Sequence, residues 1–230
     1  ITAASTNAFS AGVTSDSNDN TTAGTSAGDS FDGNNAVRNS LYGKGAGESI
    51  TIGDENSAFG ARALDATTTG QGNVAIGLDA LGSNITASYN VAVGSDSMRS
   101  NTTGASNVAV GQGALYSNTT GTQNVAVGAN ALDANTTANS NVAMGYNALG
   151  TNTTGDQQTA VGTYALQANT TGVQNTAFGS TALYSNTTAN NNTAVGFQAL
   201  YANTTGAGNV AVGADALDAN STGHNLTAIG

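Results

Sequence analysis

Hydrophobic and polar positions along this chain repeat every seventeen residues. From Gly43, glycine recurs in unbroken steps of seventeen up to Gly230, without one insertion or deletion. The residue before each glycine is apolar, and alanine stands two before it in all units but the first, as in Asn107-Val108-Ala109-Val110-Gly111. A fixed period of this length predicts a repeat architecture, in which each unit buries its apolar residues against the next unit.

Each unit predicts one short β-strand followed by turns. The three residues before the glycine are β-branched or small and largely apolar on both sides, which is typical of a strand buried on both faces. The glycine implies a positive φ or a close backbone approach. An Ala-Leu pair follows, as at 114–115, and then Asn-Thr-Thr-Gly, as at 118–121, whose side chains favour turns. We therefore predict an all-β fold, a parallel β-solenoid or β-roll of 17-residue coils stacked about 4.8 Å apart.

The period divides the chain into two parts. Residues 39–230 are predicted to form the repeat solenoid, a rod on the order of 50 Å long. Residues 1–38 are polar and outside the period, and are predicted to be an N-terminal arm or cap. The last unit stops at Gly230, and an open strand edge there favours a continuing chain or a neighbour that covers it.

Equal coils predict ladders of identical residues along the axis. Each glycine should lie over the previous one, and the Asn that opens each strand should stack as an amide ladder. The predicted structural ladder comprises Gly60, Gly77, Gly94, Gly111, Gly128, Gly145, Gly162, Gly179, Gly196 and Gly213, together with Asn73, Asn90, Asn107, Asn124 and Asn141.

Composition and charge exclude several classes of function. Only 8% of the residues are charged, the net charge is −10, and no Lys or Arg follows Arg99, which argues against nucleic-acid binding. The chain has no cysteine, no apolar run of the roughly 20 residues that a membrane helix needs, and no phosphate or dinucleotide motif. The only histidine, His224, lies at a variable loop position. We predict no enzymatic activity, no cofactor, no metal site and no membrane insertion.

The repeated motif, seen at Asn73-Val74-Ala75-Ile76-Gly77, resembles the head repeats of trimeric autotransporter adhesins, and it is also similar to bacteriophage tail-fibre shaft repeats. The resemblance covers residues 39–230, although the unit is longer here around Asn-Thr-Thr-Gly. It implies a left-handed parallel β-roll, three chains side by side, and an extracellular location on a cell surface or virion.

These observations predict a rigid fibre segment of a surface adhesin or viral tail fibre, which displays variable loops for attachment to a host or surface. The expected partner is the chain itself, as a homotrimer joined along the apolar strands. The alternative is a self-assembling filament subunit, joined end to end through residues 1–38. A more distant alternative is ice binding through the threonine columns, although Thr102 and Thr103 are adjacent in a turn and should point apart.

Two sets of side chains are candidates for recognition or modification. Aromatic residues at variable positions could stack on a host-surface glycan or contact a protein, or else pack over neighbouring leucines or line an interface: Tyr116, Tyr146, Tyr164, Tyr184 and Tyr201. The Asn-Thr-Thr triplets are candidate glycosylation sites or serve turn chemistry alone: Asn101, Asn118, Asn135, Asn152, Asn169, Asn186 and Asn203. A third group, Arg62 with Asp79 and Asp96 in successive units, predicts a surface ion pair or a cation site.

Overall fold

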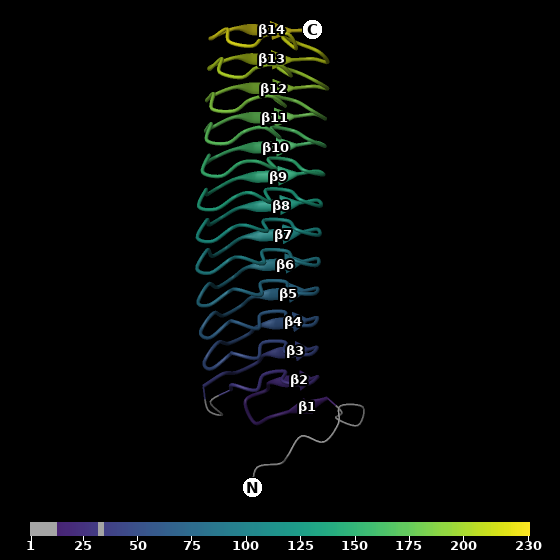
Figure 1. Ribbon diagram of the computed structural model, residues 1–230, viewed down its shortest axis with the longest axis vertical. Helices are drawn as coiled ribbons and strands as arrows, with labels where there is room; N and C mark the ends of the chain where they lie inside the picture. The colour runs from purple at the N-terminus through teal and green to yellow at the C-terminus, as the bar shows by residue number, and fades with distance from the viewer. Residues whose placement is uncertain (1–12, 32–34) are drawn as a thin grey trace.

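The computed structural model describes residues 13–31 and 35–230, which form a parallel β-solenoid (Figure 1). Regular structure in these residues is entirely β, and it contains no helix. One sheet joins all the strands in sequence order. They are β1 (Thr14–Ser15), β2 (Thr21–Ala23), β3 (Ser40–Tyr42), β4 (Ser57–Phe59), β5 (Val74–Ile76), β6 (Val91–Val93), β7 (Val108–Val110), β8 (Val125–Val127), β9 (Val142–Met144), β10 (Thr159–Val161), β11 (Thr176–Phe178), β12 (Thr193–Val195), β13 (Val210–Val212) and β14 (Thr227–Ile229).

The strand register confirms the 17-residue coil. Each strand from β3 onward pairs in parallel with the next one, and residues seventeen apart are partners. In β7 and β8, for example, Val108 lies beside Val125 and Val110 beside Val127. One turn of the chain therefore uses seventeen residues, as the glycine period predicted. The left-handed sense of the coil stays a prediction.

Alternation along each strand decides which side chains face the interior. In β7, Ala109 is fully buried, whereas Val108 is half-buried and Val110 is 38% exposed. The middle residue points inward and its two neighbours outward, as the two-residue period of a strand requires. Because the interior is narrow, this position holds one methyl group in nearly every coil. The sequence predicted that both faces of each strand are buried. In the single chain only the face that carries the alanine is buried, and the opposite face is partly exposed.

The core is a continuous column of alanine and leucine side chains. Ala114 and Leu115 are fully buried, and the same pair recurs in the neighbouring coils. Leu115 adopts a left-handed backbone with φ of 53°. That conformation costs about 1–2 kcal/mol in a residue with a Cβ, whereas burial of a leucine side chain contributes about 1.5–3 kcal/mol. Burial therefore offsets the strain, and the backbone turns sharply enough to close a short coil.

The repeated glycine meets both requirements that the sequence raised. Gly111 has φ of +138°, and a Cβ added to it would lie 2.5 Å from the carbonyl oxygen of Gly128. The same approach recurs in the neighbouring coils, for example between Gly128 and the oxygen of Gly145. The glycines therefore lie over one another, as predicted for the ladder.

The solenoid begins earlier than the sequence indicated. Residues assigned to the N-terminal arm or cap include β2, which pairs in parallel with β3. Asn20 and Asn39 are nineteen residues apart, so this first coil contains two extra residues, and the strict period did not reveal it. β1 then pairs antiparallel with β2 and covers the outer edge of the sheet. The part of residues 1–38 that is described is thus a coil with a cap, and residues 1–12 and 32–34 lie outside the described part.

Candidate functional site

The outer face of the sheet is an extended, uncharged surface of the rod. We define the sheet face as the first and third residues of β2 to β14. It contains no charged residue, and its third positions include Phe59, Met144 and Phe178, which are 42%, 43% and 56% exposed. Figure 1 shows these strands one above another in a single column from end to end. Because large contiguous apolar patches are rare on monomeric soluble proteins, this face is a candidate interaction surface.

Two internal asparagine ladders align the coils beneath this face. In the strand-side ladder, the backbone N–H of Asn107 donates to Asn90 Oδ1 over 2.9 Å, and Asn107 Nδ2 donates to the carbonyl oxygen of Gly121 over 2.8 Å. The members of the predicted ladder, Asn73, Asn90, Asn107, Asn124 and Asn141, are all fully buried. At the N-terminal end, Asp16 Oδ2 accepts from Asn20 Nδ2 over 2.9 Å, and this bond is the first cause of a lowered Asp16 pKa. The Asp16 carboxylate thus replaces the missing preceding amide.

The strand-side ladder has one irregularity. Asn141 Nδ2 is the one buried side-chain nitrogen or oxygen without a hydrogen-bond partner among the described residues. In other coils this nitrogen donates to a carbonyl fourteen residues later, as Asn124 Nδ2 does to Ala138 over 2.8 Å. The next ladder position is Gln158, whose amide is one methylene further from the backbone and donates to the carbonyl of Gly172. The longer side chain therefore interrupts the regular spacing of amides.

We expect Gln158→Asn to stabilise the protein by about 1 kcal/mol, because it restores the side-chain length of the ladder and allows Asn141 its missing hydrogen bond. Chemical unfolding followed by circular dichroism measures the difference. Gln167→Asn, outside both ladders, controls for the change of residue type. A loss of stability in Gln158→Asn would show that the longer amide is required in this coil.

The candidate glycosylation sites form the second internal ladder, on the turn side of the coil. Asn118 Nδ2 donates to Asn101 Oδ1 over 2.8 Å and to the carbonyl of Gly121 over 3.0 Å. Asn101, Asn118, Asn135, Asn152, Asn169, Asn186 and Asn203 are fully buried. A glycan on any of these nitrogens has no space in the folded coil, so the structure contradicts the glycosylation hypothesis and favours the turn interpretation. The signal in the sequence was the invariant position of these residues within the unit.

The threonines after this asparagine lie along a corner. Thr102 Oγ1 donates to the carbonyl oxygen of Thr119 over 3.0 Å, and Thr119 repeats the bond to Thr136. The following residue, Thr103, is exposed. The first threonine of each pair thus uses its hydroxyl to join coils, and only the second column faces solvent. The Thr-Thr pairs therefore give one solvent-facing column, and a second short run of outward threonines lies on the sheet at Thr159, Thr176 and Thr193. The ice-binding alternative stays a prediction.

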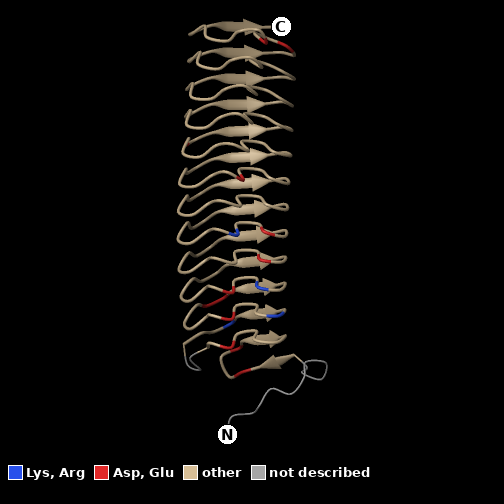
Figure 2. Ribbon diagram, viewed as in Figure 1, with Lys and Arg blue, Asp and Glu red and all other residues tan. Residues whose placement is uncertain are grey.

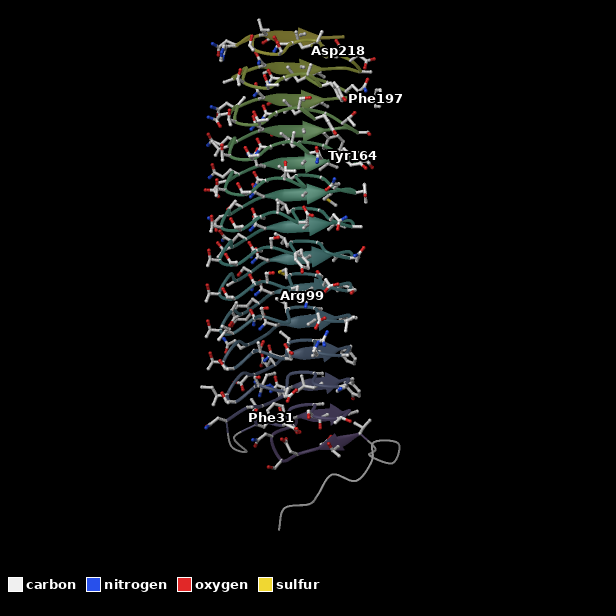
Figure 3. All side chains as sticks on the ribbon, in the orientation of Figure 1. Phe31, Arg99, Tyr164, Phe197 and Asp218 are labelled. Atoms are coloured by element: carbon white, nitrogen blue, oxygen red, sulfur yellow. The ribbon has the colours of Figure 1, made fainter. Side chains whose placement is uncertain are left out.

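Four of the five candidate tyrosines form a column of ring contacts across consecutive coils. The ring centroids of Tyr146 and Tyr164 are 5.3 Å apart, those of Tyr164 and Tyr184 are 6.4 Å apart, and those of Tyr184 and Tyr201 are 5.3 Å apart. We call these four residues the tyrosine column. Tyr116 has no ring contact of this kind and is 37% exposed. Figure 3 shows Tyr164 and Phe197 projecting at the edge of the stack beyond the strand ends.

Charged side chains gather in the N-terminal coils and leave the remaining coils nearly neutral (Figure 2). Arg38 and Glu55 form an ion pair of 2.6 Å between neighbouring coils. Arg62 pairs with Asp79, and this contact is the first cause of the lowered pKa of the Asp79 carboxyl. The predicted ion pair is therefore present, and Asp96 pairs instead with Arg99 at 3.2 Å. After Arg99 the only charged side chains in the sequence are those of Asp133, Asp156, Asp215 and Asp218.

Groups suited to catalysis or metal binding do not gather in the described residues. No cluster of three or more His, Cys, Asp and Glu side chains occurs there. The lone His224 uses Nδ1 to accept the backbone N–H of Ala207 over 3.0 Å. Burial raises the pKa of the Asp133 carboxyl, and no second ionisable group contributes to that shift. No helix of residues 13–31 and 35–230 is long and apolar enough to cross a membrane.

No family model, no curated protein and no solved structure matches this chain. A proposal about its function therefore rests on the fold and on the surfaces described above.

Proposed function

We propose that this protein is a rigid, non-enzymatic fibre segment that assembles lengthwise with copies of itself and presents variable edge residues for attachment. Its place is extracellular, on a cell surface or virion, as part of an adhesin or tail fibre. The observation that carries the proposal is the sheet face, which is free of charge along its whole length, on a rod whose interior repeats in every coil.

The sheet face suits a second copy of the chain better than a soluble partner of irregular shape. The face is regular and free of charge along β2 to β14: its third column is apolar, and its first column holds valine, serine or threonine. An identical rod presents the same spacing of about 4.8 Å between coils. About 60 Å of such a surface, two side-chain columns wide, gives several hundred Å² per chain, which approaches the area that stable interfaces bury on each partner. A homotrimer covers this face on every chain with one kind of contact.

The variable side chains lie at the edge of the stack and do not interrupt the sheet face. Inward positions are nearly constant, whereas the residues just after each strand differ from coil to coil, as Gln112, Tyr146 and Phe197 illustrate. A fold in which exchange of outward residues leaves the core untouched is well suited to display. The filament alternative, by contrast, rests on residues 1–38 joining neighbours, and residues 20–31 and 35–38 belong to this chain's own first coil.

We expect the wild-type chain to have a native mass of three times 22.4 kDa, and Phe178→Lys to shift it toward the single chain. Phe178 is 56% exposed, so lysine fits the fold of one chain, but a charge buried between copies without a partner is strongly unfavourable. Native mass spectrometry and sedimentation over a range of concentrations measure the change.

Ser180→Lys is the matched control, because this exposed residue lies just outside the sheet face and receives the same charge. Its assembly should equal that of the wild type. A wild-type chain that is monomeric at every concentration, or an assembly that Phe178→Lys does not weaken, would refute the lengthwise interface.

A further inference from the structure

The tyrosine column contains one ring whose orientation differs from the others. Tyr184 and Tyr201 are nearly parallel, with an interplanar angle of 11°, and their centroid distance of 5.3 Å is close to the spacing of the coils. Their rings therefore lie across the rod axis and cover one another. Tyr164 is turned by 75° from Tyr184 and by 87° from Tyr146. Its flat faces consequently point to the side of the column and not along it.

The surroundings of Tyr164 combine a flat apolar surface with hydroxyl groups. Desolvation, and then the neighbouring Tyr146 and Tyr184 side chains, raise the pKa of the Tyr164 hydroxyl. The Tyr164 phenol therefore remains protonated at neutral pH, and the three hydroxyls can each donate or accept a hydrogen bond. A sugar ring has the matching chemistry, because its C–H groups form an apolar face and its hydroxyls surround the edge.

The charges near the column restrict the ligand further. Between residues 134 and 214 the only charged side chain is Asp156, and no cation follows Arg99. Asp218 lies in the coil next to Tyr201, where its carbonyl accepts the N–H of Ala202 over 2.9 Å. An anionic ligand would therefore be repelled by the few carboxylates present, and a strongly cationic ligand would have too few carboxylates to pair with. These surroundings favour an uncharged ligand.

We propose that the tyrosine column binds an uncharged linear oligosaccharide, with one sugar ring stacked on Tyr164 and its hydroxyls bonded to Tyr146 and Tyr184. The site deepens the proposed function, since it identifies the chemical class to which the fibre attaches. Successive coils place the four tyrosines along the rod axis, so the oligosaccharide lies parallel to the rod. Tyr164 provides the stacking surface, and its neighbours select ligands with hydroxyl groups on the ring edge.

The test uses the intact chain and two uncharged probes, the β-1,4-linked hexasaccharides of glucose and of N-acetylglucosamine. The protein has no tryptophan, so its intrinsic fluorescence comes mainly from its seven tyrosines, four of which form the column. We expect binding of at least one probe, seen as a fluorescence change and as saturation transfer to the sugar C–H protons. Tyr164→Ala should weaken it by about tenfold, the loss of one aromatic stacking contact.

Two further variants separate stacking from folding. Tyr164→Phe keeps the ring and should retain most of the affinity, whereas Tyr116→Ala, outside the column, should bind as the wild type does. Circular dichroism checks that each variant is folded. Absence of binding by either probe at millimolar concentration, or full affinity in folded Tyr164→Ala, would overturn the proposal. Preferential binding of a lysine-rich peptide would assign the column to a cationic partner and also refute it.

Native mass measured on the same samples distinguishes this proposal from the assembly of the fibre. A chain that binds the probe as a monomer would retain the sugar site and refute the lengthwise interface, and a trimer that binds neither probe would do the reverse.

Discussion

Replacing Gly111 by alanine should destabilise the coils around it by about 3–5 kcal/mol, the sum expected for a strained φ and an overpacked backbone contact. The new Cβ would lie 2.5 Å from the carbonyl oxygen and 2.6 Å from the carbonyl carbon of Gly128. Neither atom belongs to a flexible side chain, so the coil itself has to move. Gly111 also has φ of +138°, which an alanine rarely adopts.

Hydrogen exchange measured by mass spectrometry is the most direct test, together with thermal unfolding. Each coil contacts mainly its two neighbours, so we expect exchange to increase most in the peptides containing Gly111 and Gly128. Gly82→Ala is the matched control. Its φ is outside the left-handed region, and the nearest atom to an added Cβ, the oxygen of Asp79, is 3.2 Å away. Equal destabilisation of both variants would show that backbone stacking does not explain the glycine period.

Replacing Asn118 by alanine should destabilise the protein by about 3 kcal/mol, because it breaks the turn-side ladder on both sides. Asn118 donates to Asn101 Oδ1 and to Gly121, and its own Oδ1 accepts from Asn135 Nδ2 over 2.8 Å. The remaining partners would be buried with no water to replace the lost bonds, and each such group costs about 1–3 kcal/mol. Loss of the side-chain volume adds a cavity term.

Asn118→Thr provides the control, because threonine already occurs at this phase of the unit. Thr67 is fully buried there, and Asn84 Nδ2 donates to its Oγ1 over 3.2 Å. We expect Thr at position 118 to restore about half of the stability lost in the alanine variant. Chemical unfolding followed by circular dichroism compares the three proteins. An alanine variant as stable as the wild type would mean that the ladder aligns the coils without stabilising them.

The two asparagine ladders also explain how a fold with so few large apolar side chains is held together. A parallel strand of three residues offers only a short row of backbone hydrogen bonds. The amides of Asn107 and Asn118 extend this row across the interior, since each bonds both to the same residue of the preceding coil and to a backbone carbonyl. Nearly every one of these buried amides is paired, Asn141 Nδ2 being the exception among the described residues, and such pairing requires regular spacing in the sequence.

Several elements of the fold could be predicted from the sequence, because a constant repeat length places equivalent residues of successive coils beside one another. The constant step of seventeen positions, as from Gly111 to Gly128, predicted coils of equal length. The β-branched strand without proline predicted parallel pairing between them. The amide ladder through Asn107 followed from the same arithmetic. Where the period changed, this reasoning failed. The coil that contains β2 is two residues longer, and the sequence pattern alone assigned it to an arm or cap.

The candidate sites were less accessible to sequence reasoning. Asn118 and its copies carry a glycosylation motif, yet they are buried, because a motif does not state which way a side chain points. Tyr116 and Tyr184 share one phase of the unit, but only Tyr184 has ring contacts, since these depend on Tyr164 and Tyr201 in the adjacent coils. Contacts between variable residues of neighbouring coils follow no period, and so the pattern could not reveal them.

The amino-acid sequence by itself determined the length of each coil from Gly43 onward, the positions of β3 to β14 and the residues that stack along the axis, because all three depend only on residue spacing. The tertiary structure decided which strand face is inside, which asparagines are buried and which tyrosines meet. Those outcomes depend on how the coil closes in space. Left-handed residues such as Leu115 turn alanine and leucine inward, and they leave valine and phenylalanine on the sheet face.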